Sequence, residues 1–81
     1  MQATITTNDL NPKVVYVVAG RILTQLQTST TITPAEATAT ACWQHLQEVR
    51  KLGWSDDALS ALAHTYLIVG VEIAAEAIRN H

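Results

Sequence analysis

The feature that most constrains this chain is a long helical pattern over residues 55–81, whose second half is apolar on nearly every side. Residues 66–71 form a continuous apolar run, and only Glu72, Glu76 and Arg79 mark a face suited to water. A surface helix of a small monomer normally keeps a single apolar stripe. Two short neighbouring helices cannot easily cover this much apolar perimeter, so the pattern predicts contact with a second chain.

Two apolar stripes run along this predicted helix. The first follows 3.6-residue spacing through Leu59, Leu62, Ala63, Tyr66, Val69, Ile73 and Ala77. The second lies beside it and comprises Leu67, Val71, Ala74 and Ile78. We expect the first stripe to face the core and the second to form a dimer interface, because an exposed apolar patch of that size is unusual on a soluble monomer. Gly70 and Ala74 form a small-xxx-small step, at which close approach of another helix would offset the cost of about 1 kcal/mol for a glycine inside a helix.

Capping residues mark where the helices begin and end. Asn11-Pro12 pairs a good N-cap with a residue suited to the first helical position. Thr33 and Glu36 have the spacing of a capping box around Pro34, and Ser55 precedes two acids that the helix dipole favours. Gly53 is a natural residue just beyond a helix end. These signals predict an all-α domain with three helices, near residues 12–28, 34–52 and 55–80.

The connection between the second and third predicted helices is short. Residues 53–55 allow only a tight turn, so these helices should form a hairpin that is either antiparallel or steeply crossed. Residues 1–10 are predicted to be a flexible N-terminal arm, and residues 11–81 a single helical domain. The β-branched residues within 13–18 also fit a buried strand. We favour a helix there because the apolar spacing of Val15, Val18, Ala19, Ile22 and Leu26 continues without a turn signal.

The second helix carries the residues that we expect to bind a partner. Its apolar stripe, expected to face the core, is Ala35, Ala39, Cys42, Leu46, Val49 and Leu52. Trp43 lies beside this stripe, with Gln44, Gln47 and Arg50 near it. Tryptophan and arginine are enriched among binding hot spots, so Trp43, Gln47 and Arg50 are the predicted partner-binding residues. The alternative is that Trp43 packs under the first helix.

Composition narrows the functional classes. The 81 residues carry a net charge of −2, which gives no electrostatic reason to expect nucleic acid. No uninterrupted apolar run approaches the roughly 20 residues of a membrane span, because the longest runs end at Arg21 and Glu72. A lone cysteine and no leader pattern indicate a reducing cytoplasm. We therefore expect a cytoplasmic protein that contacts no membrane.

Few side chains suggest chemistry. Cys42, His45 and His64 could approach one another across the predicted hairpin, and a thiolate with two imidazoles suits zinc. No fourth ligand is apparent, and a buried cysteine is commonly a small apolar residue, so we expect no metal and no other cofactor. Glu72 and Glu76 are interpreted as an exposed face rather than an acid–base pair. The sequence predicts that the protein is not an enzyme.

The sequence leaves two principal functional classes. We favour a homodimeric protein–protein interaction module of prokaryotic or phage type: an inhibitor, adaptor or chaperone-like regulator of an unidentified protein. The alternative is a helix-turn-helix-like transcriptional or nucleic-acid regulator, since residues 46–65 have that outline around Gly53. In that motif the third predicted helix of the chain would be the recognition helix, which needs basic or amide side chains at its start. It begins instead with Asp56 and Asp57.

Overall fold

The computed structural model of the protein describes residues 10–80, which form three α-helices. They are α1 (Pro12–Thr28), α2 (Pro34–Lys51) and α3 (Asp56–Arg79). The all-α, three-helix prediction is confirmed, each boundary lies within one residue of its expected position, and residues 13–18 are helical. The predicted N-terminal arm lies outside the described residues, apart from Leu10.

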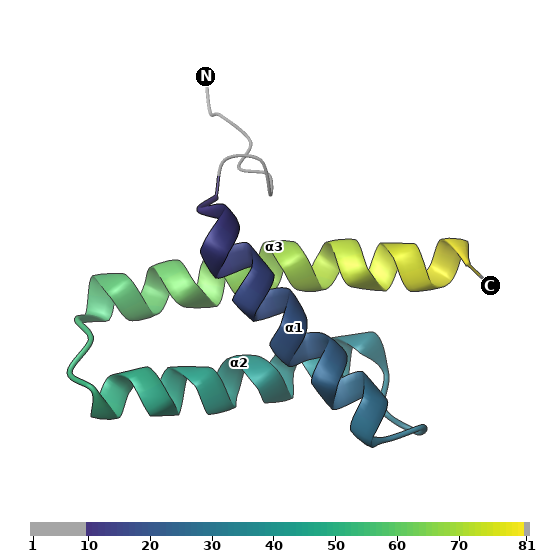
Figure 1. Ribbon diagram of the computed structural model, residues 1–81, viewed down its shortest axis with the longest axis horizontal. Helices are drawn as coiled ribbons and strands as arrows, with labels where there is room; N and C mark the ends of the chain where they lie inside the picture. Colours follow the sequence, from purple (N-terminus) through teal and green to yellow (C-terminus); the bar gives the residue numbers. More distant parts are fainter. Residues whose placement is uncertain (1–9, 81) are drawn as a thin grey trace.

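The helices form two layers (Figure 1). Helices α2 and α3 run side by side in opposite directions, and α1 crosses one face of this hairpin. The molecule measures 38 × 36 × 18 Å, and its smallest dimension corresponds to two stacked helices of about 10 Å each. One face of the hairpin is therefore covered by α1, whereas no third layer of the described chain covers the opposite face.

The core lies where α1 crosses the hairpin. Val18 and Ile22, one turn apart on α1, have no exposed surface. They belong to one buried cluster with Ala37, Ala41, Val49, Leu62, Tyr66 and Val69. The predicted inner face of α1 is confirmed, and so is the inner stripe of α3 at Leu62, Tyr66 and Val69.

The core-facing side of α2 agrees with the prediction only in part. Val49 of the predicted stripe is buried, and Cys42 and Leu46 pack against the core. Ala35, Ala39 and Leu52 of that stripe are exposed, and Ala37 and Ala41 are buried instead. Alanines occupy several sides of the first half of α2, so the apolar pattern there does not define a direction. The small side chains at Ala37 and Ala41 also allow α1 to approach closely, because side-chain size sets the distance between packed helices.

The N-terminal ends of the three helices are capped by hydrogen bonds between neighbouring residues. At the start of α2, the Glu36 backbone N–H donates to Thr33 Oγ1 at 3.2 Å, and the Thr33 N–H donates to the Glu36 carboxylate at 3.3 Å. This reciprocal pair is the predicted capping box. Asn11 and Ser55 likewise accept hydrogen bonds from backbone N–H groups in the first turns of α1 and α3.

Gly53 ends α2 and reverses the chain. Its φ of +90° lies in a region that glycine adopts without steric cost. The Gly53 N–H donates to the Arg50 carbonyl at 3.0 Å, and the Trp54 N–H donates to the Val49 carbonyl at 3.2 Å. These two bonds form a Schellman motif, which satisfies carbonyls that the helix end would leave open.

We expect Thr33→Ala to lower the free energy of unfolding by about 1 kcal/mol, the usual cost of losing an N-cap side chain. The substitution removes the hydroxyl that accepts from the Glu36 N–H and donates to the Glu36 carboxylate. Both contacts are exposed, so the core is left unchanged. Chemical denaturation at fixed protein concentration measures the change. Thr33→Ser, which keeps the hydroxyl, is the control and should unfold like the wild type; equal loss in both variants would contradict the capping explanation.

Candidate interaction surface

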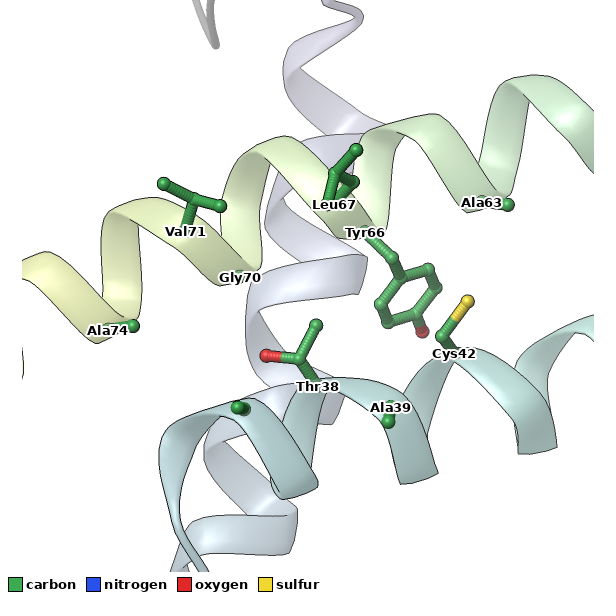
Figure 2. A pocket seen from close by; sticks show the side chains of 10 residues that line it. Thr38, Ala39, Cys42, Ala63, Tyr66, Leu67, Gly70, Val71 and Ala74 are labelled. Carbon is green, nitrogen blue, oxygen red and sulfur yellow. The ribbon is translucent and has the colours of Figure 1, made fainter.

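An apolar groove runs between α2 and α3 on the hairpin face opposite α1 (Figure 2). It has a volume of about 380 Å³, and no residue of α1 lines it. The lining residues are Ala35, Thr38, Ala39, Cys42, Ala63, Tyr66, Leu67, Gly70, Val71 and Ala74. None of these ten residues carries a charge at neutral pH, so the groove offers mainly apolar contact.

At Gly70 and Thr38, which both line the groove, α2 and α3 approach closely. A Cβ atom added to Gly70 would lie 2.4 Å from Thr38 Cγ2 and 2.7 Å from Thr38 Oγ1. The Thr38 hydroxyl already donates to the Pro34 carbonyl at 2.8 Å. Gly70 therefore lets two helices of the same chain meet. The close approach of another helix that the small-xxx-small step suggested is made, at Gly70, by α2 of the same chain.

The two walls of the groove differ in the size of their side chains. On α3, Leu67 and Val71 project outward with 62% and 61% of their surface exposed. On α2, the facing wall consists of the exposed alanines Ala35 and Ala39. Ile78, 76% exposed, extends the α3 wall beyond the groove. The predicted dimer stripe of Leu67, Val71, Ala74 and Ile78 is thus an uncovered apolar surface of the described fold.

The predicted partner-binding residues lie on α2. Trp43 is 66% exposed, which places it outside the core and excludes packing under α1. Arg50 is exposed and Gln47 is half-buried. Gln44, expected beside them, instead accepts a hydrogen bond from Gln25 of α1 at 3.2 Å. Trp43 follows Ala39, which lines the groove, by four residues, and residues at this spacing share one side of a helix.

A polar cluster contains side chains from all three helices, and its tyrosine, Tyr66, also lines the groove. The Tyr66 hydroxyl lies 2.8 Å from His45 Nδ1, and the two rings meet edge to face with centroids 5.7 Å apart. Arg21 of α1 donates to both carboxylate oxygens of Glu48 at 2.8 Å. Burial raises the pKa of Tyr66 to about 12, so the hydroxyl stays protonated at neutral pH. The tautomer of the His45 ring decides which of the two atoms donates the hydrogen.

The stability of the fold should depend on the protonation of His45. Burial, and secondarily the nearby Arg21 guanidinium, lowers the pKa of His45, with Glu48 opposing the shift. Because the folded-state pKa lies below the unfolded value of about 6.5, the unfolded chain binds more protons below that pH. The stabilising contribution is present above about pH 6.5 and is lost as the pH falls through the folded-state pKa.

We expect the melting temperature to fall between about pH 7 and about pH 5, in the range where an unshifted histidine gains its proton. His45→Asn, which cannot titrate, should reduce this pH dependence. His64→Asn, on an exposed part of α3, controls for removing a histidine from the hairpin. The explanation is wrong if His45→Asn retains the full dependence. Thermal denaturation across the pH series provides the measurement.

The candidate metal ligands do not converge. Cys42 lines the groove, His45 is hydrogen-bonded to Tyr66, and His64 lines a separate hollow beside Trp54. Within residues 10–80, no three His, Cys, Asp or Glu side chains are grouped so that they could hold a metal ion. Burial raises the pKa of Cys42, which disfavours the thiolate that binds zinc.

The hairpin also differs from a helix-turn-helix. That motif joins its helices at about 90–120°, whereas α2 and α3 lie side by side and antiparallel (Figure 1). Asp56 and Asp57 occupy the first turn of α3. Arg50 and Lys51, the cations within the predicted motif of residues 46–65, lie in the last turn of α2 and not on α3. The nucleic-acid alternative draws no support from this arrangement.

Helix α3 is long and apolar enough, by length and composition, to cross a membrane. Its most apolar 18-residue window has a mean hydropathy of 1.5, and 28% of that window is buried in the fold. The sequence expectation counted only uninterrupted apolar runs, which Glu72 ends, and so missed this property. A core helix of a soluble protein has the same length and composition, so this observation alone is weak evidence for a membrane.

Comparison with known proteins gives no match to a family model, a curated protein or a solved structure. Function must therefore be argued from the groove and its surroundings. Sequence reasoning found the α3 side of this surface through the second apolar stripe. It missed the α2 side because Ala35 and Ala39 were assigned to the core. The signal that could have found it is Gly70, whose presence in mid-helix indicates a close neighbour on that side.

Proposed function

We propose that this protein is a small non-enzymatic protein–protein interaction module, an inhibitor, adaptor or chaperone-like regulator, that acts as a homodimer. The observation that carries the proposal is the uncovered apolar stripe of Leu67, Val71 and Ile78, each more than 60% exposed. Burial of apolar side chains is the main favourable term in protein association. A contiguous apolar surface on a small domain is typical of a protein interface.

The small size of the domain supports the same proposal. A chain of about 80 residues buries a limited share of its surface, and association is a common source of added stability. The described core consists of eight buried apolar residues, three of them fully buried large side chains. Covering the α3 stripe would extend this core without any change in the helices.

A second contact surface would serve the regulated protein. Trp43 and Arg50 are exposed on α2, and both residue types are common anchors at interfaces. We propose that this part of α2 binds the partner protein. Because both side chains are exposed, a partner can contact them while α1 remains packed.

Sedimentation equilibrium at low micromolar concentration tests the homodimer. The expected result is a species of twice the 8.8 kDa chain mass. A monomer that melts cooperatively across the concentration series would overturn the homodimer, because the α3 stripe would then be tolerated in water.

We expect Trp43→Ala to leave the melting temperature nearly unchanged, because a side chain that is 66% exposed contributes little to the core. The same substitution should abolish capture of the partner protein from a lysate of the native host. Leu52→Ala, at a side chain that is 78% exposed, is the matched control and should retain capture. Unfolding of Trp43→Ala at room temperature, or full capture by it, would contradict the assignment.

A further inference from the structure

We propose that the groove between α2 and α3 is occupied by the same groove of a second copy of this chain, packed face to face about a two-fold axis. The ridge formed by Leu67 and Val71 of each copy lies in the channel above Ala35 and Ala39 of the other. This arrangement rests on the homodimer proposed above, and it specifies which surfaces meet.

The shape of the groove supports a second copy as its occupant. A two-fold interface uses one patch twice, so the patch must carry both a projection and a matching depression. Here α3 supplies the large, exposed side chains of Leu67 and Val71, whereas α2 supplies alanines, whose short side chains leave room for them (Figure 2). Rotation about an axis parallel to the hairpin places each α3 ridge over the α2 channel of the other copy.

The charges around the groove favour the same occupant. No charged side chain lines it, so it offers nothing to select a charged peptide. Helix α3 begins with two acids and carries Glu72 and Glu76 further along, against a single cation at Arg79. Helices that lie on membranes usually present Lys and Arg on their polar face, so these charges disfavour a bilayer surface as the partner.

The arrangement of the helices in layers also supports a second copy as the occupant of the groove. The hairpin is covered by α1 on one face only, and the molecule is 18 Å thick. Face-to-face packing would place four helices in two adjoining layers, with the α1 helix of each copy outermost. A membrane-spanning α3 would instead have to leave the core, since Leu62, Tyr66 and Val69 are buried against the other helices.

Cys42 provides a direct probe of this arrangement. It is the only cysteine in the chain, it is half-buried, and it lines the groove. A second copy seated there would cover the thiol. We expect the alkylation rate with a maleimide to fall about tenfold when the protein concentration rises from below to roughly a hundredfold above the dissociation constant, following the monomer fraction by mass action.

A charge exchange tests which residues meet. Val71→Glu and Ala39→Lys should each weaken self-association, because each places an unpaired charge in an apolar interface. An equimolar mixture of the two variants should form a heterodimer, in which the new carboxylate faces the new ammonium group of the other copy. Both positions are exposed in the single chain, so each variant should fold, which circular dichroism at low concentration verifies.

The results of these experiments distinguish pairing through the groove from homodimerisation by another surface. A dimeric wild type whose Cys42 reacts equally at all concentrations, or whose variants fail to complement, would overturn the groove pairing while leaving the homodimer intact. A monomer at all concentrations would overturn both. Protection of Cys42 by phosphatidylcholine–phosphatidylglycerol vesicles, without protection at high protein concentration, would overturn the second copy in favour of a bilayer.

Discussion

Val71→Glu should convert the proposed homodimer into a folded monomer. In the single chain Val71 is 61% exposed, so a carboxylate there is solvated and the helices should keep their packing. In the proposed dimer the same carboxylate would lie in an apolar interface without a partner. Burying an unpaired charge costs about 3 kcal/mol or more, which corresponds to a roughly hundredfold or larger increase in the dimer dissociation constant.

Sedimentation equilibrium of Val71→Glu measures the dissociation, and circular dichroism at matched concentrations establishes that the monomer is folded. Val17→Glu is the matched control, because Val17 is 47% exposed on α1 and lies outside the groove. That variant should remain dimeric with an unchanged helical content. Equal dissociation of both variants would indicate a general effect of charge, and a dimeric Val71→Glu would contradict the assignment of α3 to the interface.

Gly70→Ala should destabilise the fold by about 1–2 kcal/mol. Its Cβ would lie 2.4 Å from Thr38 Cγ2, so α2 and α3 must move apart or Thr38 must change rotamer. Overpacking of this kind costs about 1–3 kcal/mol, and the helix propensity of alanine returns up to about 1 kcal/mol. For a domain of this size the net change corresponds to a fall in melting temperature of about 4–8 °C per kcal/mol.

Two further variants isolate the cause of that loss. Thr38→Ala in the Gly70→Ala chain removes the two closest atoms and leaves Thr38 Cβ, 3.1 Å away, so it should restore part of the stability. Gly20→Ala is the control for helix propensity: no atom lies within 4 Å of a Cβ at that position, and the exposed site should gain up to about 1 kcal/mol. Equal destabilisation by Gly20→Ala and Gly70→Ala would contradict the steric explanation.

The same contact controls the groove. Because α2 and α3 approach closely at Gly70 and Thr38, a separation of the helices there should widen the space between Leu67 and Ala39. Gly70→Ala should therefore weaken self-association as well as the fold, whereas Val71→Glu affects association alone. Measuring both variants at several protein concentrations separates the stability of the monomer from that of the dimer, because only the latter depends on mass action.

The sequence by itself determined the three helices and their limits. Capping at Thr33 and Ser55, and the turn at Gly53, depend on hydrogen bonds between residues at most five positions apart, so the local sequence contains everything they require. The inner faces of α1 and α3 were also predictable, because large apolar residues such as Ile22 and Tyr66 recur at helical spacing and have a strong preference for burial.

Only the tertiary structure decided which side of the first half of α2 faces inward and which residues line the groove. Alanine buries little surface, so the alanines of α2 give each direction a similar apolar driving force. The choice is made by the fit of α1 over Ala37 and Ala41, which depends on residues far apart in sequence. The contact of Gly70 with Thr38 and the antiparallel course of the hairpin likewise arise from packing between helices. The exposed alanine wall of the groove follows from that packing, and no local pattern in the chain specifies it.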